Sequence, residues 1–200
     1  MDERRRPGLR QLAWMGVMTA LAAALMYLEI PLPFLPPFLK YDLGDFPALV
    51  VGFALGPVPG LAVEAGKDIL FALLRGSTPV GLAANLLAGG TWVLTAATIY
   101  WNWRTRRGAV VSLLAGGLVT TAVLAVANRY VFLPLWGIPP EAVAPMVWSA
   151  IIPFNLFKVT ATGAVTFVLY KRVRVVFLER WGLTAEPAHR GDGSMAGRPW

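Results

Sequence analysis

The hydrophobic pattern of the chain consists of apolar runs separated by short polar or proline-rich segments. Six such runs occupy residues 12–30, 43–55, 61–74, 80–101, 109–132 and 146–170. A run of about 20 apolar residues is long enough for a helix to cross the hydrocarbon core of a bilayer. The pattern therefore predicts an all-α integral membrane protein with six transmembrane helices.

The second and third runs are shorter than a straight crossing requires. The sequence Gly56-Pro-Val-Pro-Gly60 separates them and predicts a turn over 56–60. Short membrane segments interrupted by Gly and Pro often line a binding site, because irregular backbone is tolerated only where protein or water covers it. The alternative is a re-entrant hairpin with a packing role only. After the fifth run, a Pro- and Trp-rich loop is predicted over 133–145.

Composition supports a membrane location. Hydrophobic residues make up 56% of the chain and charged residues 14%, against roughly 45–50% and about 25% in soluble proteins. This excludes an ordinary soluble enzyme, and the absence of Cys excludes a disulfide-stapled domain. A net charge of +7 would also suit a protein that binds nucleic acid. The positions of the basic residues along the chain argue against that function.

The basic residues gather at the ends of apolar runs instead of on one face. The clusters are Arg4–Arg6 with Arg10, Arg104 with Arg106 and Arg107, and Lys171 with Arg172, Arg174 and Arg180. Such flanking charges set orientation in a membrane and do not indicate a nucleic-acid surface. With six spans, all three clusters share one side, so both termini are predicted to be cytoplasmic and the protein to be a multi-pass protein of the cell membrane.

The same pattern predicts three regions. Residues 1–11 form a basic cytoplasmic N-terminus, residues 12–180 form the six-helix membrane domain, and residues 181–200 form a polar tail that we expect to be disordered.

No catalytic constellation is evident. The single His is His189, in the polar tail, and there is no Cys. We therefore expect no catalytic residue, no metal site and no enzymatic activity. Asp42 and Asp45 lie close together at the start of the second apolar run and are interpreted as acids that cap a helix start.

Polar residues inside the apolar runs carry more information, because a charge in the bilayer is costly unless it meets a partner or water. Asn155 and Lys158 are three residues apart and share one helix face, and Asn128 adds another amide. Amides and an ammonium suit the edge of a planar heterocycle. The alternative is structural, with Lys158 paired to Glu64 or Asp68.

Two further patterns concern helix packing. Glu64, Lys67 and Asp68 lie within one predicted helical turn, where a Glu64–Lys67 ion pair is the simplest arrangement. In the first run, small residues recur at Gly16, Ala20 and Ala24. Such a stripe lets another helix approach closely, either within this chain or from a partner subunit.

Several segments together resemble a known family. They are Phe38-Leu-Lys-Tyr-Asp42 with Asp45-Phe-Pro-Ala48, Gly52-Phe-Ala-Leu-Gly56-Pro57, Thr78-Pro-Val-Gly81 with Asn85, and Ile152-Pro-Phe-Asn-Leu-Phe-Lys158. With Ala20-x-x-x-Ala24 in the first helix, they resemble the substrate-binding S components of energy-coupling factor (ECF) transporters, which import vitamins, and in particular the riboflavin-specific member. The likeness runs from about residue 12 to 170.

The resemblance implies a binding subunit and assigns residue roles. Asn128, Asn155 and Lys158 would hydrogen-bond the isoalloxazine ring, and the loop residues Leu39, Lys40, Tyr41 and Asp42 would close over the ligand. Riboflavin, or FMN, would be the transported ligand and not a cofactor.

The resemblance also implies partners. Gly16, Ala20 and Ala24 would dock on a transmembrane coupling subunit, which pairs with two ATPase subunits. The chain has no Gly-x-x-x-x-Gly-Lys phosphate loop, so ATP hydrolysis would come from the partners. Three alternatives stay open: an S component for another vitamin or heterocycle, a small integral-membrane enzyme, and a scaffold without ligand.

Overall fold

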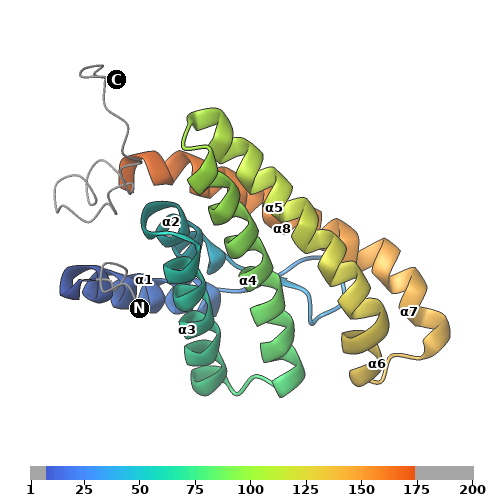
Figure 1. Ribbon diagram of the computed structural model, residues 1–200. Helices are drawn as coiled ribbons and strands as arrows, with labels where there is room; N and C mark the ends of the chain where they lie inside the picture. The colour runs from blue at the N-terminus through green and yellow to red at the C-terminus, as the bar shows by residue number, and fades with distance from the viewer. Residues whose placement is uncertain (1–7, 174–200) are drawn as a thin grey trace, which may run out of the picture.

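The structure is a computed structural model that describes residues 8–173. The tail at 181–200 and most of the basic N-terminus lie outside the described residues. Within them, the chain forms a helical bundle (Figure 1). Its helices are α1 (Leu9–Tyr27), α2 (Asp45–Leu55), α3 (Pro57–Arg75), α4 (Pro79–Asn102), α5 (Arg106–Ala127), α6 (Leu133–Leu135), α7 (Pro140–Met146) and α8 (Ile152–Val173). Two π-helical segments, η2 (Asn128–Phe132) and η3 (Val147–Ile151), join α5 to α6 and α7 to α8.

Four continuous helical stretches are long and apolar enough to cross a membrane. They are Leu9–Tyr27, Pro79–Asn102, Arg106–Leu135 and Pro140–Tyr170. With α2 and α3 they make the six predicted helical segments of the described chain. The predicted helical membrane fold is therefore confirmed.

The short helix α2 does not match a full membrane crossing. Its 11 residues extend about 16 Å at 1.5 Å per residue. Every residue of α2 is buried, because α1, α3, α4 and α8 pack around it. Its side chains form the centre of the hydrophobic core, where Leu49, Val50 and Val51 are fully buried. The sequence of α2 is therefore almost entirely apolar because other helices of the protein bury it on all sides.

The predicted turn at 56–60 is wrong in extent, because α3 begins at Pro57. Only Gly56, with φ 113°, adopts the positive φ of a turn. Pro57 starts the helix, where its missing N–H costs no hydrogen bond. A Cβ on Gly60 would lie 2.6 Å from Gly52 Cα, so glycine there allows α2 and α3 to approach closely.

The predicted loop at 133–145 is also wrong in extent. Helix α6 continues to Leu135 and α7 begins at Pro140, which leaves a connection of only residues 136–139. Proline favours the first helical position, so Pro140 starts α7 directly. The π-helical segments carry an extra residue per turn, a feature frequent at functional sites. Asn128 opens η2, and Asn155 lies one turn after η3.

A small β-hairpin was not anticipated in the predicted all-α fold. Strands β1 (Ile30–Pro31) and β2 (Lys40–Tyr41) pair antiparallel, with Ile30 opposite Tyr41 and Pro31 opposite Lys40. Two-residue edge strands tolerate proline, which lacks an N–H donor. The loop between the two strands, residues 32–39, extends across the bundle, and the hairpin brings its end back to α1 (Figure 1).

Candidate functional site

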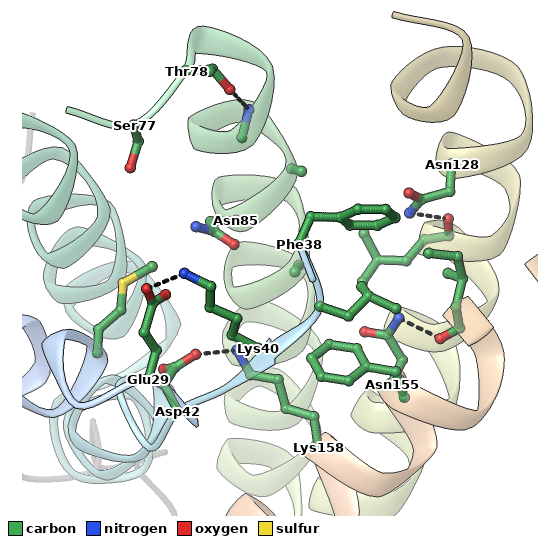
Figure 2. Close-up of a pocket in the computed structure, with 18 of the residues that line it drawn as sticks. Glu29, Phe38, Lys40, Asp42, Ser77, Thr78, Asn85, Asn128, Asn155 and Lys158 are labelled. Carbon is green, nitrogen blue, oxygen red and sulfur yellow. Dashed lines mark hydrogen bonds and ion pairs between the residues drawn. The ribbon is translucent and has the colours of Figure 1, made fainter. Parts of the chain in front are cut away.

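A cavity of about 670 Å³ lies where the end of α1, the α3–α4 turn and the start of α8 meet. This volume is in the range of small-molecule sites. Its polar lining residues are Glu29, Lys40, Asp42, Arg75, Ser77, Thr78, Asn85, Asn128, Asn155 and Lys158, several of which Figure 2 shows around one space. Its apolar walls include Met26, Phe38, Leu39, Phe71, Leu124, Trp136, Ile151 and Phe154.

Two amides occupy one side of the cavity. Asn128 and Asn155 are each 6% exposed. Asn128 Nδ2 donates to the Leu124 carbonyl at 2.8 Å, and Asn155 Nδ2 donates to the Ile151 carbonyl at 2.8 Å (Figure 2). These bonds to the preceding helical turn orient both amides. Each amide still has a carbonyl oxygen and a second N–H to offer a ligand.

Lys158 extends from α8 toward the end of the hairpin. Its Nζ donates to Asp42 Oδ2 at 3.0 Å and lies 3.2 Å from Asp45 Oδ2. The alternative pairing of Lys158 with Glu64 or Asp68 is wrong, because α8 meets the N-terminus of α2 at this point. The predicted Glu64–Lys67 pair is confirmed, at 2.6 Å.

Asp45 is the first residue of α2, as expected for an acid at a helix start. It does not cap the helix, because its oxygens contact Lys158 and Lys67, and the N-cap Gly44 offers no side chain. Asp42 uses its other oxygen, Oδ1, to accept a 2.7 Å bond from the Gly44 N–H. Both acids therefore hold the loop and α2 to the rest of the bundle through charge.

The rim of the cavity is an ion-pair network that sequence reasoning missed. Lys40 Nζ is 2.5 Å from Glu29 Oε1, and Arg75 Nη2 is 3.2 Å from the same oxygen. Glu29 lies near the end of the first apolar run and Arg75 ends α3, so nothing in either local pattern connects them. Thr78 caps α4 by accepting from the Gly81 N–H at 3.1 Å.

The four predicted loop residues do not all face the cavity. Leu39, Lys40 and Asp42 line it. Tyr41 is not among the lining residues: its ring packs on Phe157 at 5.3 Å between centroids, and its hydroxyl lies 3.4 Å from Thr162 Oγ1. Alternation along β2 explains this, because successive residues of a strand point to opposite faces.

The small-residue stripe of α1 lies away from the cavity. Gly16, Ala20 and Ala24 are all exposed, and a Cβ on Gly16 would meet nothing within 4 Å. Packing of this stripe inside the chain, the alternative left open by the sequence, is therefore not what the described residues show. Ala20 and Ala24 instead border a shallow apolar groove between α1 and α3, together with Leu70 and Leu74.

Comparison with known proteins finds a matching family and similar relatives. The family model described as "ECF transporter, substrate-specific component" matches residues 10–170. The riboflavin transporter RibU of Staphylococcus aureus (strain TCH60) is 36% identical over 189 residues, covering 90% of this chain and 100% of that protein. The riboflavin transporter FmnP of Bacillus subtilis (strain 168) is 31% identical over 191 residues, covering 90% and 98%.

A solved structure shares the fold of this chain. A solved structure of the S component of a bacterial ECF transporter superposes with a TM-score of 0.75 at 37% identity, covering 83% of this chain and 96% of that chain. The family is a transporter component and not an enzyme family, and its members are multi-pass membrane proteins. The chain belongs to the substrate-specific S components of ECF transporters.

Proposed function

We propose that this protein binds riboflavin in the cavity and delivers it for ATP-driven uptake by an ECF transporter. The observation that carries the proposal is the convergence of Asn128, Asn155 and Lys158 on one cavity of about 670 Å³. Relatives named as riboflavin transporters, similar over nearly their whole length, support the same ligand.

The isoalloxazine ring fits the side of the cavity that carries the two amides. Phe38, Trp136 and Phe154 supply apolar and aromatic surface there, and the Phe38 and Trp136 rings lie 5.1 Å apart. Flat aromatic ligands gain from such neighbours. Asn128 and Asn155 supply both donors and acceptors for the ring's carbonyl and nitrogen edge.

Lys158 supplies a charged donor to the same edge. An ammonium carries three donors, and Asp42 and Asp45 engage two of them. The third is free to meet a flavin carbonyl. The two carboxylates then act as positioning groups that hold Nζ at the cavity wall.

The hydroxylated side chain of riboflavin fits the opposite end. Glu29, Ser77, Thr78 and Asn85 line this part of the cavity (Figure 2). Hydroxyl and carboxylate groups pair well with a polyol. Arg75 and Lys40 stand at the same end, so FMN, which adds a phosphate there, is the second ligand to test.

The cavity is proposed to face outward, with both termini cytoplasmic. It lies at the C-terminal end of α1 and the N-terminal end of α8, so both described ends of the chain point away from it. The basic residues Arg104, Arg106 and Arg107 also lie at the opposite end of α4 and α5. The positive-inside rule places that end in the cytoplasm.

The exposed stripe of Gly16, Ala20 and Ala24 is proposed to dock on the transmembrane coupling subunit. Two ATPase subunits, paired with that subunit, would supply the ATP hydrolysis for uptake. Membrane helices rely on close packing because lipid offers no hydrophobic drive between them. An open small-residue face on α1 suits that requirement.

The test is a titration of purified protein with riboflavin, followed by quenching of flavin fluorescence, with FMN and unrelated vitamins in parallel. We expect saturable quenching by riboflavin with one site per protein. Saturable binding of another vitamin, with no riboflavin quenching at micromolar concentration, would reject the flavin assignment and leave the family membership unaffected.

A further inference from the structure

A buried cluster of charged side chains lies beneath the cavity, outside the residues that line it except for Asp42 and Lys158. Lys67 Nζ is 2.6 Å from Asp45 Oδ1, 2.6 Å from Glu64 Oε1 and 3.3 Å from Asp68 Oδ1. Asp45 connects this group to Lys158, and Lys158 connects to Asp42. Glu64, Lys67 and Asp68 are at most 1% exposed.

The charges of this cluster do not balance. Four carboxyl groups face two ammonium groups. Asp42, Asp45 and the two lysines form a neutral set, which leaves Glu64 and Asp68 in excess. The packed helices add no counter-charge: α4 has no charged residue, and the only charged residue of α1 is the exposed Arg10, near its other end.

The hydrogen bonding singles out the same two acids. Glu64 Oε2 and Asp68 Oδ2 are buried and have no hydrogen-bond donor among the described residues, and Asp68 Oδ1 accepts no hydrogen bond there although it lies 3.3 Å from Lys67 Nζ in an ion pair. Glu64 is also pressed against α4, where a Cβ on Gly89 would lie 1.7 Å from Glu64 Oε1. Burying an ionised carboxylate without matching donors is costly, whereas a neutral acid is much less so.

The missing positive charge is better supplied by a proton than by a metal ion. No group of three or more acidic, His or Cys side chains among the described residues is arranged to hold a metal. We propose that the Glu64–Asp68 pair is a proton-binding site: at least one of the two carboxylates takes up H⁺ and is a neutral carboxylic acid in the folded protein at neutral pH.

The direct test is infrared spectroscopy of the full chain in a detergent without ester carbonyls. A protonated carboxylic acid absorbs at higher frequency than a carboxylate, and its band shifts in D₂O. We expect such a band at pH 7 that weakens in Glu64→Gln or Asp68→Asn and is retained in Glu141→Gln, which changes an exposed acid. A spectrum without the band, or with a band that neither cluster variant alters, would overturn the proposal.

The unfolding temperatures of matched amide variants provide a second test. Asp68→Asn and Asp45→Asn make the same isosteric change on carboxyls that both contact Lys67. If Asp68 or Glu64 holds a proton, its amide variant should unfold at nearly the wild-type temperature. Asp45→Asn should unfold earlier, because it removes the charge shared by both lysines. Equal and large losses in Glu64→Gln, Asp68→Asn and Asp45→Asn would show that all three acids are ionised and would refute the site.

Discussion

Replacement of Lys158 by Met separates the binding role of its ammonium from its role in the bundle. If Nζ donates to a flavin carbonyl, the variant loses one charge-assisted hydrogen bond. Such a bond contributes about 1.5–3 kcal/mol. Since about 1.4 kcal/mol corresponds to a tenfold change in affinity, the dissociation constant for riboflavin should rise roughly tenfold to a hundredfold.

The same variant should also destabilise the ligand-free protein. It removes contacts of 3.0 Å to Asp42 and 3.2 Å to Asp45, whose side chains are 7% and 4% exposed. Breaking a buried ion pair costs about 3–5 kcal/mol. The lower end applies here, because Asp45 keeps Lys67 at 2.6 Å and Asp42 keeps the Gly44 N–H at 2.7 Å.

Two measurements on Lys158→Met separate its binding role from its structural role: a fluorescence titration with riboflavin and thermal unfolding without ligand. Arg129→Met is the control, because Arg129 also carries a positive charge near Asn128 but is exposed and stacks on Tyr130 at 5.6 Å. It should change neither quantity. Unchanged riboflavin affinity in Lys158→Met, together with reduced stability, would refute the ligand role and leave only the ion pairs.

Asn155→Leu should weaken riboflavin binding roughly twofold to tenfold, because a neutral hydrogen bond contributes about 0.5–1.5 kcal/mol; the same titration measures it. Gly89→Ala should lower stability by roughly 1–3 kcal/mol, since its Cβ would lie 1.7 Å from Glu64 Oε1; thermal unfolding measures it. Ala20→Trp with Ala24→Trp should abolish pull-down of the coupling subunit and leave riboflavin affinity unchanged, because both positions are exposed and outside the cavity.

Each of these three predictions has an outcome that would contradict it. Wild-type affinity in Asn155→Leu would remove that amide from the proposed site. Wild-type stability in Gly89→Ala would mean that Glu64 can move away from α4, and Gly81→Ala is a milder comparison, with its Cβ 3.2 Å from Thr78 Oγ1. Intact assembly in the double Trp variant would show that the α1 face is not the docking surface.

The sequence alone determined the membrane fold and the polar residues that stand out within it. Apolar runs of sufficient length require helices, because backbone groups in lipid must be satisfied within the segment. Asn128, Asn155 and Lys158 were identifiable because an amide or ammonium in such a run needs a reason to be there. The Glu64–Lys67 pair followed from helical spacing, which is local.

Contacts between separate elements became visible only in the folded structure. Lys158 pairs with Asp42, 116 residues away, and Glu29 meets both Lys40 and Arg75. No periodicity encodes such contacts, because they depend on how separate helices and the β-hairpin are placed. Helix ends also escaped sequence reasoning: Pro57 and Pro140 begin helices where a proline-rich stretch predicted a turn or loop. A proline disrupts the interior of a helix but is tolerated in its first turn, so a proline-rich stretch does not by itself show whether a helix ends or begins there.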